Sequence, residues 1–143
     1  MADLNPVLVT PVVQASTTQL AIIRVGEVTA AMSALYWDST TERYNLGDAD
    51  DADKIVITHL SLTSAAAEGY VIALPAPTDG VPVEIDPGVT LSKDTEYVLS
   101  ASTGGKIAPR ADLTTGDYYV SLFVAKTTSV GLWLPKNYGF TVS

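Results

Sequence analysis

Short runs of β-branched and aromatic residues fill most of this chain, and glycine or proline residues separate them at close, even spacing. Such runs are typical of β-strands, and the residues between them are typical of turns. No segment repeats its apolar residues with the helical period over a long stretch, so we expect helices of one turn only. The pattern predicts an all-β barrel or sandwich. The runs predicted to be strands are Leu20–Val28, Ala34–Trp37, Tyr44–Leu46, Ile55–Leu62, Tyr70–Leu74, Val81–Ile85, Thr95–Ala101, Asp117–Lys126, Ser129–Leu134 and Tyr138–Val142.

Four connecting segments carry more specific signals. Asp38–Arg43 is predicted to be the polar tip of a hairpin, because it lies between two short strands. Gly47–Lys54, in which Asp and Ala residues alternate, is predicted to be a short helical turn or an exposed loop. Thr63–Gly69 contains three consecutive alanines closed by a glycine, which predicts one helical turn with a glycine stop. The segment 104–109 begins with two glycines and ends in proline, which predicts a loop.

The chain divides into an N-terminal arm, residues 1–19, and a β-rich body, residues 20–143. Its 143 residues and mass of 15.0 kDa suit one compact domain. The arm segment Asn5–Gln14 is apolar and uncharged, and Pro6 and Pro11 favour an extended backbone while removing amide donors. Two interpretations stay open: an N-terminal strand that pairs with its own domain, or an arm that packs on another chain.

Composition excludes several classes of function. Eight Lys plus Arg against sixteen Asp plus Glu give a net charge of −8, which opposes nonspecific binding to nucleic acid. The chain has no cysteine, so disulfides, iron–sulfur clusters and thiolate zinc sites are excluded. The longest uncharged stretch, Leu4–Ile23, is interrupted by polar residues and by Pro6 and Pro11, so no transmembrane helix is predicted.

No constellation typical of catalysis or metal binding is apparent. Counted from Asp48, a calcium loop requires glycine at its sixth position and glutamate at its twelfth, where this chain has Asp53 and His59. The pattern favours a solvated acidic loop over an irregular cation site. His59 is the single histidine, which favours a partly buried, hydrogen-bonded residue over a zinc ligand. Neither a Gly-x-Ser-x-Gly elbow nor a phosphate-binding loop occurs, so we predict no cofactor and no enzymatic activity.

The chain contains Trp37, Trp133 and seven tyrosines, which are candidates for a sugar-binding face. Aromatic residues at strand positions are more often core or interface anchors, and we favour that interpretation. An exposed, coplanar pair of tryptophans in a shallow groove would instead favour carbohydrate binding.

Several segments, in order, resemble those of small tailed-phage capsid decoration proteins, also called cement proteins. In that family a Tyr-x-Leu-Ser strand runs into a glycine-rich turn and then an Ile-x-Pro, as in Tyr97–Pro109 here. Together the similar segments span roughly residues 20–135. The other similar segments are Arg24–Val28, Ala34–Trp37 and Arg43–Leu46 in the opening hairpin, Thr63–Val71 before a central strand, and Tyr118–Leu134 in the closing strands.

The resemblance implies a compact fold called a β-tulip, assembled as a homotrimer on the outer surface of an icosahedral phage capsid. Such proteins cement neighbouring subunits of the major capsid protein, and the N-terminal arm commonly takes part. We expect the chain to reside in the virion, on the head surface, with neither nucleic acid nor membrane as partner. The alternatives are a carbohydrate-binding β domain of a fibre or adhesin, with Trp37 or Trp133 as platform, and a small trimeric β-barrel enzyme. The predicted capsid-binding residues of the arm are Leu4, Asn5, Pro6, Val7, Leu8 and Val9.

Overall fold

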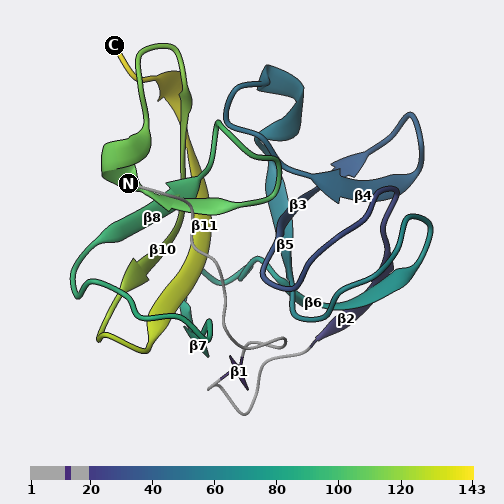
Figure 1. Ribbon diagram of the computed structural model, residues 1–143, viewed down its shortest axis with the longest axis horizontal. Helices are drawn as coiled ribbons and strands as arrows, with labels where there is room; N and C mark the ends of the chain where they lie inside the picture. Colours follow the sequence, from purple (N-terminus) through teal and green to yellow (C-terminus); the bar gives the residue numbers. More distant parts are fainter. Residues whose placement is uncertain (1–11, 14–19) are drawn as a thin grey trace.

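The computed structural model of the chain describes residues 12–13 and 20–143, which fold into two antiparallel β-sheets (Figure 1). The predicted all-β, barrel-like architecture with short helical turns is confirmed. Figure 1 shows the two curled sheets beside each other, the six-stranded sheet on the left and the five-stranded sheet on the right. The helices within the described residues are too short to cross a membrane.

The five-stranded sheet contains the first half of the body, in the order β2-β6-β5-β3-β4. It curls so strongly that Val25, just after β2, bridges Tyr44 in β4, at the opposite side of the sheet. Its concave face encloses a small apolar cluster that includes Ile23, Leu35 and Val71. Its strands are β2 (Ala21–Arg24), β3 (Ala34–Asp38), β4 (Arg43–Leu46), β5 (Ile57–Ser61) and β6 (Tyr70–Pro75).

The six-stranded sheet has the order β1-β7-β11-β10-β8-β9. Its longest pair is β10 with β11, and β7 pairs with β11 only at residues 131–133. Short β1 pairs with β7 through Val12↔Asp86 and Val13↔Ile85. The strands are β1 (Val12–Val13), β7 (Val83–Asp86), β8 (Glu96–Leu99), β9 (Ile107–Pro109), β10 (Tyr118–Ala125) and β11 (Gly131–Thr141).

The main core lies between the sheets. Trp133 and Phe123 of the six-stranded sheet and Leu60 and Leu74 of the five-stranded sheet are all fully buried in one cluster. The Trp133 indole Nε1–H donates a hydrogen bond of 3.2 Å to the Pro75 carbonyl, which ties β11 to β6. The core aromatics therefore join the two sheets, as the interpretation of aromatic residues as core anchors predicts.

Among the described residues, the helical content is limited to two single turns, η1 (Ala52–Lys54) and η2 (Arg110–Asp112). The first confirms the helical-turn alternative for the segment Gly47–Lys54, and the Asp51 side chain caps it by accepting a hydrogen bond from the Asp53 amide. The helical turn predicted over Thr63–Gly69 is wrong. Ala65 instead bridges Thr29 through two backbone hydrogen bonds of 2.9 Å, so tertiary pairing overrides the local helix preference of the alanines.

Two strand predictions near the C-terminus also need correction. The segment 107–109, predicted to be part of a loop, forms β9 against β8, and its Pro109 is tolerated because β9 is an edge strand. The runs Ser129–Leu134 and Tyr138–Val142, predicted as separate strands, are one strand, β11. Pro135 does not end it, because β11 has by then passed β7 and its second edge has no described strand partner.

Candidate interaction surfaces

The predicted arm residues Leu4, Asn5, Pro6, Val7, Leu8 and Val9 lie outside the described residues. Within the described part, the features that could recognise a partner are exposed apolar side chains gathered on strands. Three such surfaces and one acidic cavity stand out.

The first surface, the β2–β6 strip, consists of Leu20, Ile22, Tyr70 and Ile72. Ile22 is 76% exposed and pairs with Ile72 across the two strands. Ile72 and the fully buried Leu74 are two residues apart in β6 and therefore lie on the same face of the strand. This face is part of the core at Leu74 and is exposed to solvent at Ile72. β2 is also an edge strand of its sheet. The strip is therefore an apolar sheet face that the second sheet does not cover.

The rim of the β2–β6 strip carries both signs of charge. Glu68 accepts ion pairs from Arg24 at 3.3 Å and from Arg43 at 2.8 Å. The Arg24 guanidinium also lies 5.9 Å from the centre of the Tyr70 ring. Two arginines and one glutamate leave one excess positive charge, but each charge of this group is held in an ion pair.

The second surface lies on the ribbon formed by β10 and the second half of β11. The rings of Tyr138 and Phe140 are packed against that of Tyr119, at centroid distances of 4.7 and 5.5 Å. Two cations lie over these rings: Arg110 is 5.0 Å from the Tyr119 ring and Lys136 is 4.9 Å from the Tyr138 ring. We call these five residues the aromatic–cation face.

Glu96 of β8 joins this face to its neighbour in the sheet. Its carboxylate accepts a hydrogen bond from the Tyr119 hydroxyl and an ion pair from Arg110 at 3.7 Å. Burial of the phenol, followed by the adjacent Glu96 carboxylate, raises the pKa of Tyr119 to about 12. Tyr119 therefore stays protonated and keeps its hydroxyl as a donor throughout the neutral range.

The third surface lies at the concave side of the five-stranded sheet, where three rings are stacked edge to face. Trp37 is 4.9 Å from Tyr44, and Tyr44 is 4.8 Å from His59. His59 is partly buried and its Nδ1 shares a hydrogen bond of 2.9 Å with the Thr58 hydroxyl, which confirms the prediction for this residue. Burial lowers the pKa of the His59 imidazole, so the ring is neutral at pH 7.

The tryptophans do not form the paired platform that would favour sugar binding. Trp133 is 0% exposed, so it cannot contact a sugar, whereas Trp37 is 47% exposed. Trp133 is therefore a core anchor, as the favoured interpretation predicts, and the alternative of Trp133 as a sugar-binding platform is wrong because this residue lies in the core between the sheets.

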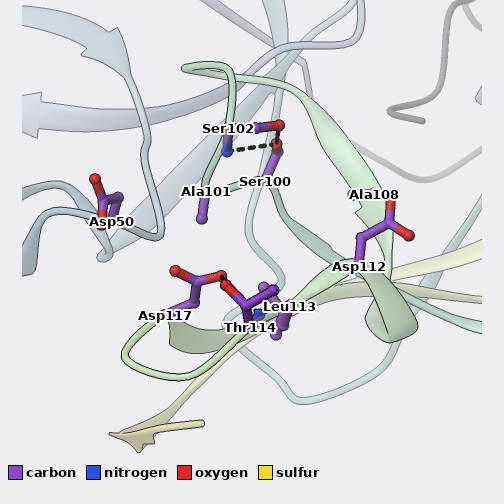
Figure 2. Close-up of a pocket in the computed structure, with 9 residues that line it drawn as sticks. All are labelled: Asp50, Ser100, Ala101, Ser102, Ala108, Asp112, Leu113, Thr114 and Asp117. Atoms are coloured by element: carbon purple, nitrogen blue, oxygen red, sulfur yellow. Dashed lines mark hydrogen bonds between the residues drawn. The ribbon is translucent and has the colours of Figure 1, made fainter. Parts of the chain in front are cut away.

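An acidic cavity of about 270 Å³ lies where the Gly47–Lys54 loop approaches the start of β10 (Figure 2). Asp50, Asp112 and Asp117 line it, together with Ser100 and other residues. The Asp117 carboxylate is occupied in accepting hydrogen bonds from the Thr114 amide, at 2.8 Å, and the Thr114 hydroxyl. Within the described part of the chain, no cluster of His, Asp and Glu side chains has the arrangement needed to hold a metal ion.

Sequence reasoning missed the aromatic–cation face. The signal available was the alternation of Tyr138 and Phe140 in the last predicted strand, with Tyr119 in the strand that precedes it in the sheet. The register that brings them together contains a bulge, which the sequence does not reveal. No protein-family model, curated protein or solved structure matches the chain.

Proposed function

We propose that this protein is a structural virion protein that binds the outer surface of an icosahedral phage capsid as a homotrimer and cements neighbouring major capsid protein subunits. The observation that carries the proposal beyond the sequence resemblance is the gathering of exposed apolar side chains on open strand faces. Contiguous apolar patches of this kind favour contact with another protein. The β2–β6 strip is the surface that we assign to the shell, because its apolar side chains are exposed on two paired strands and the charges beside it are already held in ion pairs.

The strength of the strip can be gauged from its side chains. Fully burying a large apolar side chain contributes roughly 1.5–3 kcal/mol, and the four side chains of the strip are between 41% and 76% exposed. Covering all of them would contribute on the order of 5 kcal/mol, which is comparable to the smallest costs of association. One strip therefore holds a single copy weakly. Several strips presented by one oligomer, with added contacts from the N-terminal arm, bind far more tightly through effective concentration.

The test uses capsids prepared without this protein and the purified full-length chain. Cryo-electron microscopy of these capsids with and without added protein is expected to show new density at threefold positions between capsomers. The double variant Ile22→Ser/Tyr70→Ser is expected to bind at least about tenfold more weakly, because it removes apolar area from the strip without touching the core. A matched control is Val81→Ser/Val124→Ser, which removes exposed apolar side chains elsewhere.

Deletion of residues 1–11 tests the arm separately. The deletion ends before β1, so the pairing of Val12 and Val13 with β7 is retained. We expect unchanged thermal unfolding of the body and weaker capsid binding. Absence of threefold density with the wild-type protein, or full binding by both the truncated and the strip variants, would show that the proposal is wrong.

A further inference from the structure

The ribbon of β10 and β11 is an incomplete piece of sheet. Beyond Trp133, strand β11 pairs with β10 on one edge, and its other edge has no strand partner among the described residues. Residues 136–141 are all exposed. Two-stranded ribbons are marginal in water without a further strand or a packed face. The ribbon is therefore a surface whose stability gains from contact with a partner.

The side chains on this ribbon are of the type that protein interfaces use. Phe140 is 51% and Tyr138 41% exposed, and Arg110 is exposed beside them. Tyrosine and arginine are enriched among the residues that contribute most to binding between proteins. Because Tyr119, Tyr138 and Phe140 already pack against one another, little side-chain freedom remains to be lost on binding.

Charge indicates what the ribbon contacts. Lys136 makes no ion pair with any described residue, and Arg110 pairs with Glu96, so the two cations of the aromatic–cation face outnumber the carboxylate paired with them, in a chain of net charge −8. The densest negative charge of the chain lies in the loop 48–53, which holds four aspartates. Lys54, the cation next to this loop in the chain, lies 3.9 Å from the Asp51 carboxylate. The chain thus carries both halves of a complementary pair.

We propose that the aromatic–cation face of one copy docks on the acidic loop 48–53 of the next copy, head to tail. Face-to-face pairing of two ribbons would bring Lys136 and Arg110 against their own copies, and like charges oppose such a contact. A head-to-tail contact avoids this repulsion and can close into a ring. The number of copies in that ring, three, is taken from the proposed function, and the rest of the inference does not depend on it.

The test is sedimentation velocity of the purified full-length chain, without capsids, over a wide range of protein concentration at low and high salt. The wild-type chain is expected to self-associate, and Tyr138→Ser/Phe140→Ser to weaken association at least about tenfold. Lys136→Glu and the double variant Asp50→Lys/Asp53→Lys are each expected to weaken it by a similar factor at low salt. A chain that carries all three charge reversals is expected to recover most of the loss, because the two halves are again complementary.

The matched control is Ile22→Ser/Tyr70→Ser, which removes comparable apolar area from the other surface and should leave self-association unchanged. Circular dichroism of every variant confirms that the body is folded. A wild-type chain that stays monomeric at all concentrations overturns the proposal, as does unchanged association of Tyr138→Ser/Phe140→Ser. Charge reversals that weaken association singly but do not compensate each other also overturn it, because the loop is then not opposite the ribbon. Since no capsid is present, none of these failures bears on shell binding, which the strip variant reports independently.

Discussion

The indole of Trp133 is expected to be one of the largest single contributors to stability. It is fully buried, and it supplies the 3.2 Å hydrogen bond that links β11 to the Pro75 carbonyl of the other sheet. Truncating a buried aromatic residue to alanine costs about 3–5 kcal/mol, and leaving the partly buried Pro75 carbonyl without its donor adds about 1–3 kcal/mol. Trp133→Ala is therefore expected to lose about 4–8 kcal/mol, a large share of the 5–15 kcal/mol typical of a domain.

Because such a loss could unfold the chain, Trp133→Phe is the more informative variant. Phenylalanine keeps a ring in the core but removes the N–H donor and part of the volume, so we expect a loss of about 2–3 kcal/mol. The measurement is urea unfolding followed by circular dichroism, with an unchanged dependence on urea as the check for two-state behaviour.

The chain provides its own control in Trp37, which is half exposed and lies on the other sheet. Trp37→Phe is expected to cost less than about 1 kcal/mol, since it removes mostly solvated surface. If Trp133→Phe costs no more than Trp37→Phe, the indole does not tie the two sheets together as described.

Three further predictions concern other sites. Burial lowers the pKa of His59, so on acidification the unfolded chain is protonated at a higher pH than the folded chain. The free energy of unfolding should therefore keep its full value above about pH 6.5 and decrease as the pH falls below it, less steeply in His59→Gln. Gly105→Ala should lower the free energy of unfolding by about 2–4 kcal/mol, because φ is +75° and the added Cβ would lie 2.6 Å from a leucine methyl group. Gly139→Ala is the control: φ is +78° but the space around it is open, so the loss in the same urea assay should be only about 1–2 kcal/mol. Asp50→Asn/Asp51→Asn should change the unfolding free energy of the dilute monomer by no more than about 0.5 kcal/mol, as for surface sites.

The strands could be predicted from sequence where local pattern and tertiary pairing agree. The hairpin around Asp38–Arg43 forms as predicted, because its tip is polar and its two runs are short and rich in strand formers. The Asp38 carboxylate accepts hydrogen bonds from the Thr40 and Thr41 amides in this tip. The helix prediction for Thr63–Gly69 is wrong because a helical turn here would bury no large apolar side chain, whereas in the extended form the backbone of Ala65 pairs with that of Thr29.

The surfaces could not be predicted, because they depend on where one sheet stops covering the other. In β6, Ile72 and Leu74 have the same strand character and lie on the same face, yet one is exposed and the other fully buried. No local pattern distinguishes them, since the difference is that Leu74 lies in the cluster between the two sheets and Ile72 lies outside it. The arm residues Leu4–Val9 remain a prediction from sequence alone.

The β2–β6 strip and the aromatic–cation face differ in chemistry, so binding at the two surfaces should depend differently on salt concentration. The β2–β6 strip is apolar and the charges at its rim are already held in ion pairs, so its binding depends mainly on area removed from water, which salt does not weaken. The aromatic–cation face relies in addition on Arg110 and Lys136, whose reach shrinks to about 3 Å in molar salt. If the strip contacts the shell and the ribbon contacts the next copy, raising salt should dissociate the oligomer before it reduces the intrinsic affinity of a single copy for the capsid. At high salt, protein would then leave the capsid because its oligomer dissociates and the copies no longer bind together, so the amount released should follow the fraction of oligomer dissociated. An oligomer held together by covalent cross-links should stay bound at the same salt concentration.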